Sequence, residues 1–341
     1  MLKKTVSSTS FYIWGLVPVL LLVFIANISM GAIQIPFKQV VLLLLGEEVD
    51  KESWKYIVLN YRLPKAIIAV LVGVALSVSG LLMQTLFRNP MADSYVLGLS
   101  SGASLGVAVV ILGASFLPLY FQQFFISAGG IVAASILGSF CILLVVLLGA
   151  RKVQDSMTLL IIGLMFGSFA SAVVGVLTYF SSAEQLKRYT FWAMGSLGNL
   201  DWQAVGFFTT AVLVGLALSV KSFKALDALL LGERYAASMG ISIKSARMLI
   251  ILATSILSGA STAFAGPIAF VGLAVPHIAR LLFKTSSHKL LCFASMLLGA
   301  ILLLICDMIT QFPGQAFVLP INAVTSILGA PVVIWLLLRK G

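Results

Sequence analysis

Long apolar segments, separated by short polar connections, run along the whole chain. From Ala66 to Phe87 no residue is charged, and a helix of that length, rising about 1.5 Å per residue, crosses a hydrocarbon core about 30 Å thick. The charge-free stretch from Ser94 to Ala150 is too long for one helix and must fold back on itself. The pattern therefore predicts an all-α polytopic membrane protein with about ten transmembrane helices. Their approximate positions are Tyr12–Gly31, Lys65–Phe87, Tyr95–Leu112, Phe124–Leu148, Met157–Phe180, Ala204–Val220, Met248–Ala265, a short span ending near Phe283, Leu290–Ile309 and Ala323–Leu338.

Charged residues bracket the second predicted span. Arg62 and Lys65 precede it, with Pro64 between them near the expected helix start. Arg88-Asn89-Pro90 follows it, and a proline disfavours helix in the residue before it, so the triplet predicts a helix stop. Transporters also place moving gates where a helix is broken at the membrane edge. The stop and the gate are compatible, and both interpretations stay open at this stage.

Small residues recur every four positions in two segments, which places them on one face of a helix. This spacing lets neighbouring helix backbones approach closely, so packing is the first interpretation and a translocation pathway the second. The first set, after the break at Pro90, is Gly98, Gly102 and Gly106, and the second, in the fifth predicted span, is Gly163, Gly167, Ser171 and Gly175.

The connections differ in their charge. The polar connection at 34–61 contains four acidic residues between Glu47 and Glu52, and the connection at 181–203 contains aromatic residues that suit a membrane interface. The segment Lys221–Arg247 is the most charged loop of the chain. Its mixture of charged and small residues predicts one or two short amphipathic helices. Such a helix suits a groove on a soluble partner.

Composition excludes a water-soluble protein. The chain is 60% hydrophobic and 10% charged, with a mean hydropathy of +1.11, so we expect a single transmembrane domain over residues 1–341. No P-loop motif occurs, so an ATP-hydrolysing domain must belong to another chain. The three cysteines lie in apolar segments without metal-ligand spacing, and His277 lacks a second histidine at such spacing, so no metal site is expected.

The net charge of +11 predicts contact with lipid headgroups rather than with nucleic acid, because Lys and Arg gather in cytoplasmic loops of membrane proteins. With ten spans both termini lie on one side of the membrane. Fifteen of the 22 Lys and Arg residues then fall on the side of the termini and seven on the other side. This asymmetry predicts that both termini are cytoplasmic.

Several motifs resemble those of one family. GLLMQTLFRNPMADSYVLGLSSGASLG, at residues 80–106, is similar to the signature of the FecCD/BtuC family of ABC importer permeases. The segments Gly266–Arg280, Leu231–Gly240 and Leu328–Pro331 resemble that family's second signature, its cytoplasmic coupling segment and its last helix. The resemblance covers nearly the whole chain in the same order.

The resemblance implies a BtuC-like permease homodimer, in a bacterial cytoplasmic (inner) membrane, bound to two cytoplasmic ABC ATPase subunits and to an extracytoplasmic substrate-binding protein. The cargo would be a metal chelate, with an iron–siderophore complex first and vitamin B12 or haem as alternatives. ATP would be used by the partner, so this chain is expected to bind no cofactor and to carry no catalytic residue.

The resemblance also assigns roles to residues. Arg62 and Lys65 would dock the binding protein. Coupling to the ATPase would involve about 221–247, with Leu231, Gly232, Glu233, Arg234, Ala237 and Gly240 at its centre. The hinge or gate residues would be Arg88, Asn89, Pro90, Gly266 and Pro267, and the pathway would be lined by Gly163, Gly167, Ser171 and Gly175. Three features depart from the family pattern: Lys65 and Gln311 stand where arginine is common, and 318–322 is unusual.

Asp307 is the only acid well inside a predicted span. Intramembrane carboxylates often mark proton or ion pathways, so a proton-coupled secondary carrier that uses Asp307 is the alternative function. No relay partner is evident in the sequence. We therefore expect Asp307 to be hydrogen-bonded inside the bundle or to lie near the outer surface.

Overall fold

The structure is a computed structural model, and it describes residues 13–31, 33–93, 98–113, 127–152, 156–198, 200–311 and 318–338. The predicted starts of the first, third and fourth spans, at Tyr12, Tyr95 and Phe124, lie outside these residues. Helices form nearly all the regular structure of the described ranges, apart from an isolated bridge between Gln311 and Val318. The elements are α2 (Leu16–Ser29), α3 (Phe37–Leu44), α4 (Glu52–Ile57), the π-helix η1 (Val58–Arg62), α5 (Leu63–Leu86), α6 (Leu99–Ile111), α8 (Ala128–Lys152), α9 (Ser156–Tyr179), α10 (Ala183–Ala193), α11 (Trp202–Leu231), α12 (Glu233–Ser238), α13 (Ile243–Ala265), α14 (Val271–Phe283), α15 (His288–Thr310) and α16 (Ile321–Leu338).

The all-α membrane fold is confirmed. Six described helical segments are long and apolar enough to cross a membrane, namely Glu52–Leu86, Gly129–Gly149, Thr158–Tyr179, Trp202–Leu231, Ile243–Ala265 and His288–Thr310. Four shorter apolar helices, α2, α6, α14 and α16, occupy the positions of the other predicted spans. The count of ten transmembrane helices stays a prediction.

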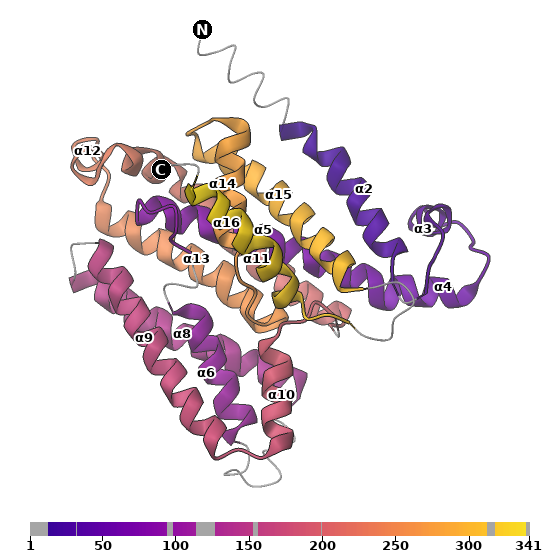
Figure 1. Cartoon of the computed structure of the whole chain (residues 1–341). Coiled ribbons are helices and arrows are strands. Elements are labelled where there is room, and N and C mark those ends of the chain that lie inside the picture. The colour runs from indigo at the N-terminus through magenta and orange to yellow at the C-terminus, as the bar shows by residue number, and fades with distance from the viewer. Residues whose placement is uncertain are drawn as a thin grey trace.

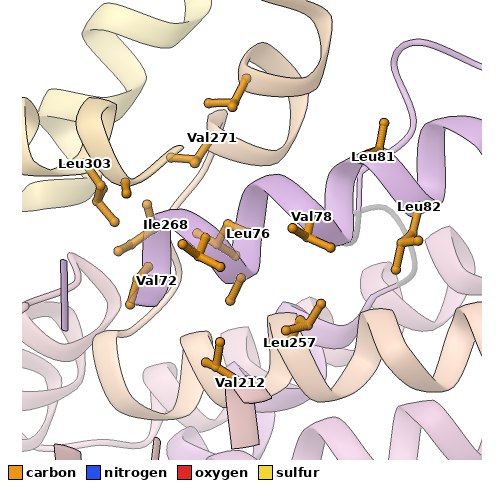
Figure 2. Packing of buried hydrophobic residues seen from close by; sticks show 14 of the residues in the cluster. Val72, Leu76, Val78, Leu81, Leu82, Val212, Leu257, Ile268, Val271 and Leu303 are labelled. Atoms are coloured by element: carbon orange, nitrogen blue, oxygen red, sulfur yellow. The ribbon is translucent and has the colours of Figure 1, made fainter. Parts of the chain in front are cut away.

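Helix α5 is the centre of the bundle, because it is buried on all sides by α11, α13, α14 and α15 (Figure 1). Its apolar side chains lie among those of the surrounding helices, such as Val212 of α11, Leu257 of α13 and Leu303 of α15 (Figure 2). Gly73 and Gly80 bring it closest to its partners, since a Cβ at either position would overlap the carbonyl of Gly299 or Gly272. The most apolar stretch of the sequence thus forms the core.

Helices α6, α8, α9 and α10 form a second group, below α5 in the view of Figure 1. The small residues of α6 pack as the spacing predicted: a Cβ on Gly102 would lie 2.6 Å from the carbonyl oxygen of Gly138, and one on Gly106 would overlap the carbonyl of Ala134. Helix α13 contacts both α5 and this group. Helix α13 therefore packs against both groups of helices.

Helix α5 begins at Leu63, so Pro64 lies in its first turn as predicted, but helical structure starts before it. One helical run extends from Glu52 to Leu86, so part of the predicted 34–61 connection is helical. Proline lacks an N–H and cannot continue a regular bonding pattern. The wider π-helical turn precedes it, in which the Leu63 N–H bonds the carbonyl of Val58. The π-helical turn therefore accommodates the missing N–H donor of Pro64, and the helix continues through the proline.

The predicted end of the sixth span at Val220 is also too early, and the loop interpretation of 221–231 is wrong. Helix α11 continues to Leu231 because its apolar face continues, with Leu226 and Leu229 buried while Lys221 and Lys224 point outward. Charges on one face of a helix lower the average hydropathy of the segment without interrupting the helix. The connection at 181–203 likewise contains a helix, α10, which begins at a capping box of Ser182 and Gln185.

Candidate functional site

An ion pair joins α5 to α15 at the end of the bundle that we call the Lys65 end. Lys65 Nζ lies 2.8 Å from Asp307 Oδ1, and the two side chains are 20% and 2% exposed. The other carboxylate oxygen of Asp307 accepts hydrogen bonds from Asn27 Nδ2 at 3.0 Å and Gln311 Nε2 at 2.9 Å. Asp307 is thus hydrogen-bonded inside the bundle, and Lys65 is the partner that was not evident in the sequence.

Arg62 holds the carboxyl end of α2. Its guanidinium donates to the carbonyl oxygens of Ile28 at 2.7 Å, Ser29 at 3.0 Å and Ile33. A cation is favourable there, because the last carbonyls of a helix lack partners and carry partial negative charge. Arg62 and Lys65 are therefore both engaged within the chain, and their role in docking stays a prediction.

A cavity of about 860 Å³ opens at the same end, between α5, α10, α15 and the start of α16. Both Lys65 and Asp307 line it, together with polar groups such as Asn60 and Asp201 and with the apolar ring of Trp192. Cavities of about 300–1,000 Å³ with a few convergent polar groups are typical of small-molecule sites. The arrangement can therefore receive a compact, partly polar ligand or the tip of a protein loop.

Gly266 and Pro267 lie near this cavity rather than near Pro90. Gly266 has φ +76°, and a Cβ on it would approach the carbonyl of Trp192 to 2.8 Å and the Cα of Gly195 to 2.9 Å. Its neighbouring loop is tied to α16, because Asn322 Oδ1 accepts from the Ala269 N–H at 3.1 Å. The two predicted hinges therefore lie at opposite ends of the bundle.

The opposite end, which we call the Glu233 end, contains the predicted hinge Arg88-Asn89-Pro90. Helix α5 ends at Leu86, the Asn89 N–H bonds the carbonyl of Gln84 at 3.1 Å, and Arg88 turns the chain with φ 47°. The Arg88 guanidinium lies 3.7 Å from the position of a Cβ on Gly232, at the junction of α11 and α12. The structure thus brings a predicted hinge residue next to the predicted coupling segment.

Helix α12 is fixed by its inner face and exposed on its outer face. Glu233 Oε1 accepts from Arg247 Nη2 of α13 at 3.2 Å, and Ala236 is fully buried. Tyr235 of this helix is largely exposed, as are Leu231, the last residue of α11, and Met239, which directly follows α12. These three apolar or aromatic side chains recur every four residues, a spacing that is visible in the sequence.

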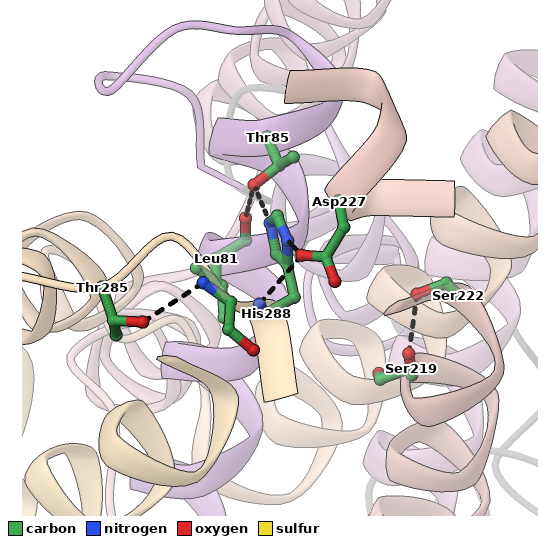
Figure 3. A network of polar contacts seen from close by, with 8 residues as sticks. Leu81, Thr85, Ser219, Ser222, Asp227, Thr285 and His288 are labelled. Carbon is green, nitrogen blue, oxygen red and sulfur yellow. Dashed lines mark hydrogen bonds and ion pairs between the residues drawn. The ribbon is translucent and has the colours of Figure 1, made fainter. Parts of the chain in front are cut away.

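A second polar cluster at this end was missed by the sequence reasoning, which singled out His277 instead. His288, at the start of α15, lies with Nδ1 2.6 Å from Asp227 Oδ1 of α11 and with Nε2 2.9 Å from Thr85 Oγ1 of α5 (Figure 3). Neither residue type nor spacing marks these three positions, because they come together only when the three helices pack.

The predicted pathway residues on α9 divide into two kinds. Gly163 and Gly167 pack against the turn that begins α6, where a Cβ on Gly98 would lie 2.8 Å from the Gly163 carbonyl oxygen. Ser171 and Gly175 are exposed, and among the described residues a Cβ on Gly175 would meet no atom within 4 Å. The first pair is a packing contact, and the lining of a pathway by the second pair stays a prediction.

Comparison with known proteins gives consistent matches along the chain. The model of the FecCD transport family matches residues 19–339. The chain is 34% identical to the hemin transport system permease protein HmuU of Yersinia pestis, over 94% of this chain and 93% of that protein. It is 37% identical to the vitamin B12 import system permease protein BtuC of Klebsiella pneumoniae, over 96% of this chain and 94% of that one. A solved metal-chelate type ABC transporter in an inward-facing conformation shares 26% identity with a TM-score of 0.84, covering 97% of this chain and 99% of that chain.

Proposed function

The chain belongs to the FecCD transport family, and we propose that it is the membrane-spanning permease subunit of a type II ABC importer for metal chelates. The observation that carries the proposal is the match of the family model over nearly the whole chain. The structure supports it with two polar clusters at opposite ends of α5, the Lys65 end and the Glu233 end. A permease needs one face for receiving cargo and another for receiving mechanical work.

In this proposal the Lys65 end faces outward and the Glu233 end faces the cytoplasm, as the distribution of Lys and Arg favours. A substrate-binding protein docks over the cavity lined by Lys65 and Asp307. ATPase subunits, one for each copy of a permease homodimer, receive α12 and the residues that flank it through the exposed side chains of Leu231, Tyr235 and Met239. The exposed half of the α9 stripe, at Ser171 and Gly175, then faces the pathway between the two copies.

Movement of the ATPases would reach the membrane helices through rigid contacts. The Glu233–Arg247 ion pair fixes α12 to α13, and α11, which ends at Leu231 directly before Gly232 and α12, runs as one helix into the bundle. Arg88 next to Gly232 places the end of α5 within reach of the same movement. The chain itself performs no covalent chemistry in this account, and ATP is hydrolysed by its partners.

We propose an iron–siderophore complex as the first cargo to test. The relatives named for hemin and for vitamin B12, and the structure named for a metal chelate, support the wider class of metal chelates. Haem and vitamin B12 are therefore the two other candidates. The cavity at the Lys65 end is large enough for a compact ligand, and among the described residues that line it no group selects one chelate over another.

The test is ATPase activity in liposomes that hold this chain with its ATPase and, in turn, a binding protein loaded with each cargo class. Stimulation by the ferric-siderophore-loaded protein is the expected result. Stimulation by the haem-loaded or vitamin-B12-loaded protein alone would identify that compound as the cargo and leave the assignment as an importer unchanged. Absence of any association with an ATPase would contradict the proposal.

Docking is tested in the same liposomes by Lys65→Gln and Arg62→Gln, with Lys38→Gln on the exposed face of α3 as the matched control. Electrostatic docking mainly changes association rate and its dependence on salt. We expect each of the first two variants to slow association of the binding protein severalfold at low salt, with the control unchanged. Equal rates in all three variants would show that these residues serve the fold alone.

A further inference from the structure

Asp227, His288 and Thr85 link three helices by direct polar contacts at the Glu233 end. His288 is 1% exposed, and both of its ring nitrogens have partners: Asp227 Oδ1 at 2.6 Å and Thr85 Oγ1 at 2.9 Å. The His288 backbone N–H also donates to Asp227 Oδ1 at 3.0 Å. Figure 3 shows the imidazole ring between the two side chains. We call these three residues the His288 latch.

The chemistry of the contacts fixes the proton positions. A carboxylate only accepts hydrogen bonds, so His288 Nδ1 carries a hydrogen and donates it to Asp227. The single hydrogen of the Thr85 hydroxyl can go to His288 Nε2 or to the Leu81 carbonyl, which lies 3.0 Å away. It goes to Nε2 when the ring is neutral. The bond to Asp227 involves an ionised acceptor and is the stronger of the two contacts.

The position of the latch is what distinguishes it from an ordinary buried network. Asp227 lies one turn before Leu231, where α11 passes into the coupling helix α12. Thr85 lies in the last turn of α5, directly before the break at Arg88. His288 is the first residue of α15, so Asp227 also caps the amino end of that helix. The latch therefore joins the coupling segment to the cytoplasmic ends of two membrane helices.

We propose that the His288 latch is a positioning device that transmits movement of α12 to α5 and α15 during transport. Resting on the proposed function, the inference adds the residues through which the work passes. Asp227 is 48% exposed while its partner is buried, so the contact can be broken from the water side without opening the core. While the His288 ring keeps its contacts with Asp227 and Thr85, helices α5, α11 and α15 are expected to move together.

The test uses the complete reconstituted importer and measures cargo molecules transported per ATP hydrolysed. Thr85→Val removes the hydroxyl with little change in shape, and Thr85→Ser keeps the hydroxyl. Asp227→Asn removes the charge from the stronger contact. We expect Thr85→Val and Asp227→Asn to lower cargo per ATP at least fivefold while ATP hydrolysis continues, and Thr85→Ser to stay within twofold of the wild type.

Ser222→Ala is the matched control. Ser222 is buried on the same helix as Asp227, and its hydroxyl donates to the Ser219 carbonyl of its own helix at 2.7 Å (Figure 3). We expect it to leave cargo per ATP unchanged. Thermal unfolding of every variant separates folding from coupling.

A lower unfolding temperature with an unchanged cargo-to-ATP ratio in Thr85→Val and Asp227→Asn would contradict the proposed role of the latch. The proposed function as an importer would be unaffected. If one variant fails to fold, the ratio in the other decides the outcome. Wild-type protein that transports no cargo with ATP would overturn the proposed function itself, and the latch with it. The two failures are therefore distinguishable.

Discussion

A carboxylate inside a membrane helix needs an opposite charge and hydrogen-bond donors around it, because hydrocarbon provides neither. Asp307 has Lys65 on one oxygen and the amides of Asn27 and Gln311 on the other. These partners come from α2, α5 and the end of α15. The arrangement is that of a structural tie between helices, and it accounts for Asp307 without a proton pathway.

Asp307→Asn is expected to lower the free energy of unfolding by about 1–3 kcal/mol, because it leaves the largely buried Lys65 ammonium without its counter-charge. Thermal unfolding in lipid nanodiscs measures the loss. Glu184→Gln is the control, since it breaks an ion pair of similar length whose two side chains are exposed, and such pairs contribute little. ATP-driven uptake is expected to persist in Asp307→Asn, and its complete loss at unchanged stability would favour the proton-coupled carrier.

The Lys65–Asp307 pair also shows how far a site can be predicted from sequence. The distribution of Lys and Arg put Lys65 at the outer end of the second predicted span, and Asp307 lies close to the end of the ninth. Sequence placed both residues on one side of the membrane, but adjacency of α5 and α15 depends on packing that no local pattern contains. Lys65 and Gln311, the two positions at which the family resemblance leads us to expect arginine, contact the same carboxylate.

At the scale of elements, glycine positions control how closely helices approach. Gly106→Ala is expected to destabilise the protein by about 1–3 kcal/mol, because the added methyl overlaps a backbone carbonyl of α8 that cannot rotate away. Gly175→Ala is the matched control on α9. Its Cβ meets nothing within 4 Å among the described residues, and alanine is the better helix former by about 0.5–1 kcal/mol.

Thermal unfolding of the purified chain compares the two variants. The account predicts shifts of opposite sign, downward for Gly106→Ala and upward for Gly175→Ala. Equal shifts would mean that the spacing of small residues does not determine the packing of α6 on α8.

Helix α12 allows a separate prediction about its exposed face. Tyr235→Ala combined with Met239→Ala is expected to weaken binding of the ATPase at least tenfold, equivalent to about 1.4 kcal/mol, without lowering the unfolding temperature. Tyr56→Ala, which truncates an equally exposed side chain on α4 at the opposite end, is the control. Co-purification with a tagged ATPase measures the effect, and equal recovery with both variants would place the contact elsewhere.

Most helices could be predicted from the sequence where hydrophobicity alone determines the position of a helix. The segments that became α8, α9, α13 and α15 were placed to within a few residues, because their apolar runs end at charged or turn residues. Along 221–231 the charged residues indicated a boundary, whereas burial of the remaining apolar face kept the helix intact. Before Arg62 and at 181–203 the polar composition indicated a connection, whereas α4, η1 and α10 are helical.

At the scale of the whole molecule, α5 connects the two functional ends. Its first turn holds Lys65 in the wall of the cavity at the Lys65 end, and its last turn holds Thr85 in the His288 latch. Close packing against α14 and α15 through Gly80 and Gly73 makes it a stiff connection. A disturbance at either end is therefore expected to reach the other through movement of whole helices rather than through local bending.

We infer that hydrolysis of ATP by partner subunits drives transport through this chain. The most direct test is cargo uptake into proteoliposomes that contain the chain, its ATPase and its loaded binding protein, with the proton gradient collapsed by an ionophore. The account predicts accumulation that requires hydrolysable ATP and stops when a non-hydrolysable analogue replaces it. Uptake by this chain alone, driven by a proton gradient and indifferent to ATP, would contradict it.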